Sequence, residues 1–314
     1  GGLHTRAIRR ELKLVNLRDL RYLVAVAEHR HFGRAAEACF VSQPTLSTQL
    51  KKLEETLGVI LFERSNRRVM LTPEGEQIVQ QTQRILVEVN SLTALSEQLR
   101  DPLGGDLRVG IIPTVAPYLL PKVLVPLQKA FPDLRIQLTE GQTANISRML
   151  KQGDLDATLL ALPLGEENIE EAGLYDEPFV LAVPANHPKA KLACVTSDDL
   201  EGEQVLLLED GHCFRDQALE VCQAHRGIES KSYSATSLET LRQLVSAGVG
   251  VTLIPELAVP RQIRADESIR YIPFDAVGSD QPMRTLGLCW RATSTRGELL
   301  QQVATVLQQC MSGP

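Results

Sequence analysis

The segment from residue 16 to residue 58 restricts the fold more than any other part of the chain. Apolar residues recur there at spacings of three and four, as the buried face of a helix requires. They are Leu17, Leu20, Leu23, Val24 and Ala27 in a first helix, and Leu46, Leu50, Leu53 and Leu57 in a last one. An Ala-rich stretch, residues 33–39, predicts a short helix between them, followed by a turn at residues 40–43. This order predicts a helix-turn-helix, whose last helix fits the major groove of DNA.

The ends of the third helix and the segment after it support this interpretation. Pro44 falls in the first helical turn, where a missing N–H costs nothing, and Gly58 ends the helix. Helical spacing leaves four polar residues facing outward: Thr45, Thr48, Gln49 and Lys52. The residues that follow, LFERSNRRVMLTPEG, predict a hairpin wing. Three arginines near its tip suit phosphates or a narrow minor groove: Arg64, Arg67 and Arg68.

The charge of the chain is distributed unevenly. The net charge is −6, but residues 15–70 hold nine Lys/Arg against six Asp/Glu, and residues 1–14 hold four against one. A basic N-terminal segment on an acidic remainder is typical of a DNA-binding domain joined to a regulatory domain, with chance variation along the chain as the alternative. Residues 1–14 begin with Gly-Gly rather than Met, and we expect them to be a tail or a remnant of processing or engineering outside the fold.

Residues 73–100 predict one long helix. Apolar residues recur in it every seven positions, which indicates a seam between two helices and therefore a homodimer. They are Ile78, Ile85, Leu92 and Leu99, with Val89 between them. The alternative is a helix that packs only on its own wing. Residues 101–105, DPLGG, break the helix, so we expect residues 73–105 to form a dimerisation helix and a linker.

Residues 106–314 alternate between predicted strands and helices, which indicates an α/β domain. Residues 106–176 and 281–314 are expected to form the first lobe together. The later segment supplies a strand at 284–291 and a last helix near 295–310. Residues 180–278 are expected to form a second lobe. The predicted fold is therefore an all-α winged helix-turn-helix domain over residues 15–72, the long dimerisation helix, and an α/β regulatory domain of two lobes.

The residues FGRAAEACFVSQPTLSTQLKKLEETLGVILFER closely resemble the signature of LysR-type transcriptional regulators. An Ala-rich helix is followed by Ser-Gln-Pro-x-Leu-Ser and then by a Leu-Gly-x-x-Leu-Phe wing. The resemblance implies two lobes similar to those of periplasmic binding proteins, with a cleft that holds a small metabolite in most members. It also implies that Arg18 and Arg64 touch the DNA backbone. The recognition surface that it implies consists of Ser42, Gln43, Pro44, Thr45, Ser47 and Thr48.

Two of the six cysteines stand in a segment that resembles the peroxide-sensing members of this family. The segment is LLLEDGHCFRDQALEVC, residues 206–222, and residues 112–121 and 235–242 carry the same resemblance. It implies that Cys213 reacts with hydrogen peroxide and that Cys222 resolves the product. The residues that it implies around the peroxide are Thr114, Thr143, His212 and Asp216, with Arg284 helping to hold the reactive thiolate.

The residues around Cys213 support this chemistry without the resemblance. A thiolate attacks the O–O bond, so the pKa of a sensing cysteine must be lowered. Cys213 opens the helical run FRDQALEVCQA, and the helix dipole, His212 and Arg215 all favour negative charge there. The sulfenic acid formed on Cys213 can condense with a second thiol, for which Cys222 is the candidate. Two unrelated thiols in one helix are the alternative.

The spacing of the two cysteines predicts a conformational change. Cys213 and Cys222 are nine positions apart, which in a helix separates them by about 13 Å and about half a turn. A disulfide needs Cα atoms within about 7 Å, so the helix must melt or move before the bond forms. The remaining cysteines are expected to be structural: Cys39, Cys194, Cys289 and Cys310.

The resemblance to the peroxide-sensing members implies a transcriptional activator of antioxidant genes rather than an enzyme. A thiol peroxidase uses similar cysteine chemistry but has no use for a helix-turn-helix and a dimer helix. The stronger alternative is a regulator of the same family that responds to a small organic effector in the cleft. The sequence holds no Cys-x-x-Cys pair and no apolar run that could span a membrane, so we expect a cytoplasmic protein without metal or cofactor. The expected partners are promoter DNA, hydrogen peroxide, further copies in a homodimer or homotetramer, RNA polymerase, and a glutaredoxin or thioredoxin system as reductant.

Overall fold

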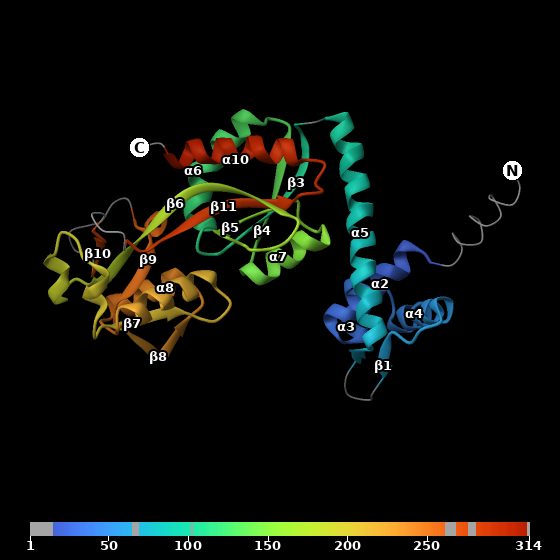
Figure 1. Ribbon diagram of the computed structural model, residues 1–314, viewed down its shortest axis with the longest axis horizontal. Helices are drawn as coiled ribbons and strands as arrows, with labels where there is room; N and C mark the ends of the chain where they lie inside the picture. Colours follow the sequence, from blue (N-terminus) through green and yellow to red (C-terminus); the bar gives the residue numbers. More distant parts are fainter. Residues whose placement is uncertain (1–14, 65–68, 102, 261–267, 276–280, 313–314) are drawn as a thin grey trace, which may run out of the picture. The chain divides into compact units, whose positions relative to one another are not determined.

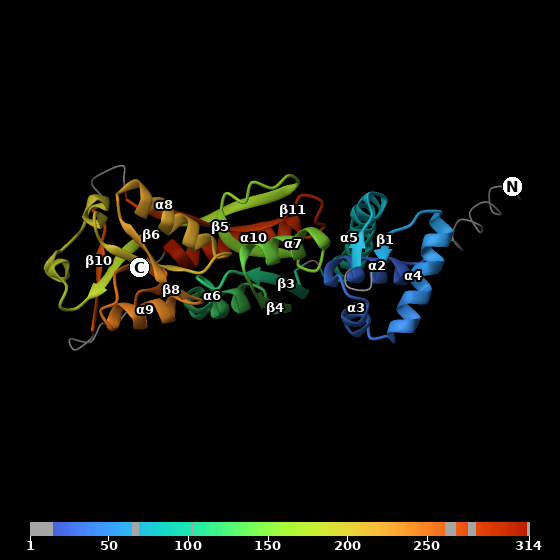
Figure 2. The ribbon, with the colours of Figure 1, turned by 90° about the horizontal axis from the view of Figure 1, so that it is seen from below.

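The computed structural model describes residues 15–64, 69–101, 103–260, 268–275 and 281–312. The chain divides into two compact units, residues 1–93 and 94–314, and the boundary falls inside the long helix α5 (Pro73–Arg100). Figure 1 and Figure 2 show the helices and strands of each unit from two directions. Among the described residues, no helix combines the length and the apolar character needed to cross a membrane.

The first unit contains the predicted winged helix-turn-helix. Its elements are α2 (Leu17–His29), α3 (Phe32–Ala38), α4 (Gln43–Leu57) and an antiparallel hairpin of β1 (Phe62–Arg64) and β2 (Val69–Leu71). The side chain of Asn16 caps α2 and that of Ser42 caps α4, and each accepts a backbone N–H three residues further on. Gly58 ends α4 with a φ of +70°, a conformation that suits glycine.

One apolar core holds these helices together. Leu23, Leu46 and Leu50 are at most 1% exposed, which confirms the predicted buried faces of α2 and α4. The small side chains of Ala35 and Ala36 on α3 are buried in the same cluster and let the helices approach closely. The prediction was wrong for Leu17, which is 44% exposed because it is the first residue of α2 and lies beyond the packed surface.

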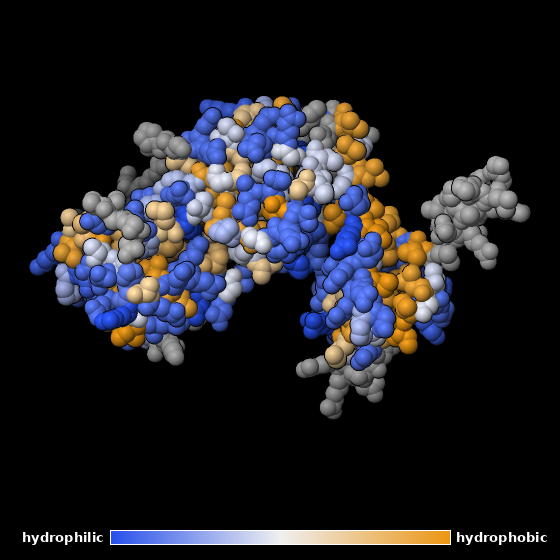
Figure 3. Space-filling view, in the orientation of Figure 1, coloured by the Kyte–Doolittle hydropathy of each residue, from blue (hydrophilic) through white to orange (hydrophobic). Residues whose placement is uncertain are grey.

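Helix α5 leaves apolar side chains exposed. Of the seven-residue repeat, Ile78 packs against the core of the first unit, whereas Ile85, Leu92 and Leu99 are 39, 69 and 78% exposed. Figure 3 shows hydrophobic atoms on the surface of this helix. Exposed apolar residues at this spacing are what a two-helix seam presents on a single chain.

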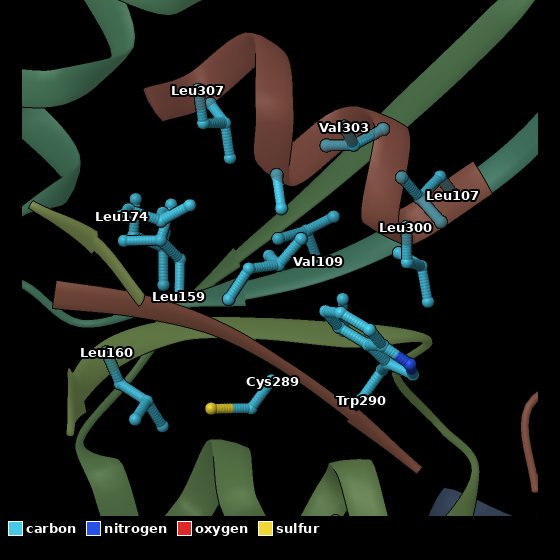
Figure 4. Packing of buried hydrophobic residues seen from close by; sticks show 14 of the residues in the cluster. Leu107, Val109, Leu159, Leu160, Leu174, Cys289, Trp290, Leu300, Val303 and Leu307 are labelled. Atoms are coloured by element: carbon cyan, nitrogen blue, oxygen red, sulfur yellow. The ribbon is translucent and has the colours of Figure 1, made fainter. Parts of the chain in front are cut away.

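The second unit has two lobes, each with its own apolar core. The first lobe contains β3 (Gly105–Ile111), α6 (Ala116–Ala130), β4 (Leu134–Glu140), α7 (Thr143–Gln152), β5 (Ala157–Leu162), β11 (Met283–Arg291), α10 (Gly297–Ser312) and the first part of β6 (Ile169–Pro184). Strands β4, β3 and β5 are parallel, and β11 lies antiparallel between β5 and β6. Leu107, Val109 and Leu159 point toward α10, whereas Leu160 and Cys289 point to the opposite face of the sheet (Figure 4).

The second lobe is built around the other end of β6. It contains the short helices η1 (Pro188–Lys191), η2 (Ser197–Leu200) and η3 (Glu256–Ala258), and β7 (Gln204–Leu208), α8 (Cys213–Ala224), β8 (Ile228–Ala235), α9 (Leu238–Ser246), β9 (Thr252–Pro255) and β10 (Ile269–Pro273). Strand β6 pairs with β9 and β10, and β7 pairs in parallel with β8. The expected α/β domain of two lobes is confirmed.

Strand β6 passes from one lobe into the other. Residues 169–178 pair with β11 in the first lobe, and residues 180–184 pair with β10 in the second. Along β6, the continuous apolar pattern of a buried strand begins only at Phe179. The early part of β6 carries several carboxylates, which interrupt the apolar pattern of a buried strand.

Candidate functional site

Cys213 lies where the two lobes meet. It is the first residue of α8, a helix of the second lobe, yet its half-buried side chain packs against the core of the first lobe. The predicted start of the helix at this residue is confirmed. The N-cap residue, His212, makes no side-chain capping bond, so the partial positive charge of the first turn is not neutralised by its own cap.

A second helix begins beside this residue. Gly211 has a φ of +96°, and a Cβ built on it would lie 2.7 Å from Oε1 of Gln142. Gln142 is the N-cap residue of α7 in the first lobe and makes no side-chain capping bond either. The N-termini of one helix from each lobe therefore lie next to the loop that carries Cys213. Their partial positive charges favour an anion such as a thiolate.

Arg284 forms a buried hydrogen-bond network next to the first turn of α8. Its Nε donates to Oε2 of Glu177 at 2.7 Å, its Nη1 donates to Oγ1 of Thr114 at 2.8 Å, and its Nη2 donates to the Thr114 carbonyl at 3.2 Å. Both charged side chains of the Arg284–Glu177 pair are fully buried. The guanidinium also lies over the ring of Phe214, the neighbour of Cys213, at 5.3 Å from its centroid. Arg284 thus fixes Thr114 close to α8, while its charge is balanced by Glu177.

The other expected site residues differ in their surroundings. His212 is 6% exposed. Thr143 is the first residue of α7, and its buried Oγ1 has no hydrogen-bond partner among the described residues. The buried Oε1 of Gln217, one helical turn after Cys213, has none in this part of the chain either. Asp216 is exposed on the first turn of α8. The hydroxyl of Thr143 and the amide of Gln217 can therefore accept hydrogen bonds from a bound molecule.

Arg215 serves a purpose other than the expected one. Its Nε donates to Asp210 at 2.7 Å and its Nη2 donates to Glu229 at 3.0 Å. These two carboxylates balance its charge, so the expected contribution of Arg215 to a Cys213 thiolate is reduced. The pair with Glu229 instead ties the first turn of α8 to β8 and stabilises the helical form of residues 213–224.

Cys222 is enclosed in the core of the second lobe. It is 0% exposed, and a Cβ built on Gly227 would lie 2.7 Å from its Sγ. Burial, reinforced by the negative charge of Glu229, raises the pKa of the Cys222 thiol. All six cysteines are free thiols. Cys213 and Cys222 thus belong to one intact helix but pack against the cores of different lobes. Their spacing predicted only that they face opposite sides of the helix.

The face of the helix-turn-helix that the sequence assigned to DNA is accessible. Seven of the expected residues are exposed, and Ser47 is half-buried. The exposed ones are Arg18, Ser42, Gln43, Pro44, Thr45, Thr48 and Lys52. Arg64 is the last residue of β1, and nothing further describes its side chain. Arg67 and Arg68 lie outside the described residues.

Comparison with known proteins places these features in a family. Residues 17–76 match the bacterial regulatory helix-turn-helix protein model of the lysR family, and residues 100–312 match the LysR substrate binding domain. The chain belongs to the LysR family. It is 46% identical over 299 residues to the DNA-binding transcriptional dual regulator OxyR of Escherichia coli, which covers 95% of this chain and 97% of the relative.

Solved OxyR structures resemble this LysR protein over nearly its whole length. A single-residue variant of full-length OxyR from Pseudomonas aeruginosa superimposes with a TM-score of 0.71 at 40% identity, covering 94% of this chain and 95% of that one. A hydrogen-peroxide-bound variant of OxyR from Corynebacterium glutamicum gives a TM-score of 0.64 at 36% identity, covering 94% and 92%. The sequence-based identification as a LysR-type regulator that closely resembles OxyR is confirmed.

The LysR resemblance did not reveal every residue around Cys213. Gln142, Glu177, Phe214 and Gln217 were missed. The first two lie in the first lobe, far from Cys213 in sequence, and no local pattern connects them with it. Gln217 could have been found, because it stands four positions after Cys213 and so shares its helical face.

The other four cysteines of this LysR protein have different environments. Burial raises the pKa of Cys39 and of Cys310, and burial with the nearby Glu171 raises that of Cys289 to about 12. Cys39 ends α3 and packs on the core of the first unit, in agreement with a small hydrophobic role. Cys194 is exposed.

Proposed function

We propose that this LysR-family regulator senses hydrogen peroxide through Cys213 and a reversible Cys213–Cys222 disulfide, and that it activates antioxidant genes. The observation that carries the proposal is the packing of the two thiols. They lie at opposite ends of one helix and contact the cores of different lobes, so joining them requires a change of fold. The relatives named for OxyR and for hydrogen peroxide support the same proposal.

The reaction has two steps. The Cys213 thiolate attacks one oxygen of hydrogen peroxide, the O–O bond breaks, and the products are a sulfenic acid and hydroxide, which takes up a proton to become water. The Cys222 thiol then displaces the sulfenic oxygen as a second water, and the disulfide forms. A cellular dithiol, for which a glutaredoxin or thioredoxin is proposed, reduces the disulfide again.

The groups around Cys213 have separate tasks in the first step. The N-termini of α8 and α7 stabilise the thiolate, and the unpartnered hydroxyl of Thr143 and amide of Gln217 orient the peroxide. Arg284 holds Thr114 in position. In this proposal, the buried N-cap residue His212 and Asp216 on the exposed first turn of α8 complete the peroxide pocket.

The second step converts a local reaction into a switch. The helix rise places the two Cα atoms about 13 Å apart, whereas a disulfide needs them within about 7 Å. Cys222 must leave the apolar core of the second lobe, and α8 must unwind. A refolded segment in the regulatory domain then changes the contacts between copies of the chain, and those contacts set the spacing of the paired recognition helices.

The proposed assembly follows the domain organisation. Residues 15–72 bind promoter DNA, residues 73–105 dimerise through the exposed apolar repeat of α5 and lead into the linker, and residues 106–314 sense peroxide. A homotetramer, contacts with RNA polymerase and a cytoplasmic location complete the proposal. The protein is a regulator rather than an enzyme in this scheme, because the product of oxidation that matters is a change in DNA binding.

The experiment uses the full-length reduced protein and one equivalent of hydrogen peroxide. Mass spectrometry should find a Cys213–Cys222 disulfide in the wild type, no reaction at residue 213 in Cys213→Ser, and sulfenic or over-oxidised Cys213 in Cys222→Ser. Cys194→Ser, which removes an exposed thiol elsewhere, is the matched control and should behave as the wild type. DNA binding should change on oxidation only where the disulfide forms.

Two results would contradict the proposal. If no disulfide forms at any peroxide dose, or if Cys213→Ser keeps its response, a small effector in the interlobe cleft becomes the better explanation. Peroxide turnover with thioredoxin that leaves DNA binding unchanged between the reduced and oxidised forms would instead indicate a peroxidase.

A further inference from the structure

Phe40 is the most exposed large apolar residue in the part of the chain that the structure describes. It stands in the turn between α3 and α4 (Figure 2) and is 95% exposed. Its neighbours Cys39 and Val41 both pack on the core of the first unit, whereas Phe40 does not. The ring is therefore left in water on the single chain.

The backbone at this position suits glycine rather than phenylalanine. Two hydrogen bonds close a Schellman turn after α3. The N–H of Phe40 donates to the carbonyl of Glu37 at 3.0 Å, and the N–H of the next residue donates to that of Ala36 at 3.0 Å. Phe40 accordingly has a φ of +55°, in the left-handed region. A bulky side chain is unfavourable in that region, and glycine is the usual residue at this point of the motif.

Folding stability explains neither the exposed ring nor its backbone conformation. The other described non-glycine residues with a positive φ are Arg30, Asn168 and Arg226, whose polar side chains are well hydrated. An apolar ring gains nothing from water and adds strain to the turn. A residue that breaks two local rules without any gain for the fold points to a contact with another molecule.

The position of Phe40 in the chain indicates which molecule that is. It lies two residues before Ser42, the N-cap of the recognition helix α4, and the exposed residues Gln43, Pro44 and Thr45 follow. The first residues of such a helix reach the base edges in the major groove. Thymine presents an apolar 5-methyl group there, and phenylalanine is one of the side chains that contact it.

We propose that the ring of Phe40 contacts the 5-methyl group of a thymine beside the bases that α4 reads, and so selects T·A at that position of each half-site. The inference rests on the proposed promoter binding by residues 15–72 and makes no use of the cysteine chemistry. Burial of the ring against the methyl group offsets the strain of the turn only when DNA is bound. Phe40 is thus a specificity residue that the free protein holds ready in an unfavourable conformation.

The test uses the full-length reduced protein and a duplex that it selects from a randomised pool. Each thymine of the duplex is replaced in turn by deoxyuridine, which lacks only the 5-methyl group. At one thymine of each half-site the replacement should weaken binding about fourfold, the factor expected for one buried methyl group. Phe40→Gly should bind the unmodified duplex at least as weakly, and should lose no further affinity with deoxyuridine at that position.

Two measurements separate the contact from a folding effect. Because glycine suits the left-handed turn, the urea midpoint of Phe40→Gly should not fall below that of the wild type. Ile60→Ala is the matched control, since it trims another exposed apolar side chain of the first unit, which is 69% exposed. It should keep the wild-type affinity and the wild-type sensitivity to deoxyuridine.

The outcomes distinguish this contact from promoter binding as such. A selected duplex in which no thymine is sensitive, or a Phe40→Gly protein as sensitive as the wild type, would overturn the methyl contact alone. A Phe40→Gly protein that binds DNA normally but no longer supports transcription would also overturn it and would assign the ring to a protein partner. If Phe40→Gly fails to fold, Phe40→Asn, which also tolerates a positive φ, takes its place. A wild type that selects no duplex would overturn the proposed promoter binding as well.

Discussion

Gly227→Ala offers a direct test of the idea that Cys222 leaves its core when the disulfide forms. In the reduced protein, a Cβ at residue 227 would lie 2.7 Å from Sγ of Cys222 and 3.3 Å from its carbonyl oxygen. A Cβ atom essentially never lies within 3 Å of a non-bonded heavy atom, and Cys222 is fully buried, so its thiol has no free space to move into. The substitution therefore strains the reduced form.

The size of the effect follows from the strain. Overpacking a filled core costs about 1–3 kcal/mol. If Cys222 has left this contact in the oxidised form, only the reduced form carries the cost, and the disulfide becomes correspondingly harder to reduce. The reduction potential of the Cys213–Cys222 couple should then become more negative by about 20–65 mV, because about 30 mV corresponds to 1.4 kcal/mol for two electrons.

Equilibration with glutathione or dithiothreitol buffers, read by mass spectrometry, measures this potential. Urea unfolding of the reduced protein should show a loss of stability of similar size. Gly173→Ala is the control, since its Cβ would meet only Thr285, at an ordinary 3.8 Å, and both quantities should stay unchanged. A reduced form that is destabilised without any change of potential would show that the contact between Cys222 and Gly227 persists after oxidation, and the reasoning would be wrong.

Four other substitutions test three separate parts of the molecule. Arg64→Ala should weaken DNA binding across all sequences and flatten its salt dependence, whereas Gln43→Ala should change which DNA sequence is preferred. Binding titrations at several salt concentrations compare the two variants. An unchanged salt slope in Arg64→Ala would show that the wing does not contact the phosphates. Glu177→Gln leaves the buried Arg284 without its counter-charge and should cost about 3–5 kcal/mol of unfolding free energy, measured by denaturant titration; a loss under 1 kcal/mol would mean that the pair is not closed in solution. The pKa of Cys289 is raised to about 12 in the folded state, so the unfolded chain releases this proton first as the pH rises. The wild type should therefore lose stability relative to Cys289→Ala by about 1.4 kcal/mol per pH unit above about pH 9, and parallel pH profiles of the two proteins would contradict that assignment.

The sequence by itself determined the local elements and the family. Helical spacing, a Pro in the first turn and a terminal Gly define α4, because these features act within a few residues of the chain. The same local physics placed the start of α8 at Cys213 and put Cys222 on another side of that helix. The seven-residue repeat of α5 likewise identified the apolar side chains that the structure leaves exposed, including Leu92 and Leu99.

Only the tertiary structure decided what surrounds Cys213 and Cys222. The buried pair of Arg284 with Glu177 joins residues that are more than a hundred positions apart in sequence, and the approach of Gln142 to Gly211 joins different lobes. No local pattern encodes such contacts, because they depend on how strand β6 passes from one lobe into the other and pairs with β11. The residues that balance the charge of Arg215 could also be identified only from the tertiary structure. The sequence placed Arg215 beside the reactive thiol, but its partners Asp210 and Glu229 became visible only when α8 packed on β8, since a charge acts on whichever opposite charge lies nearest in space.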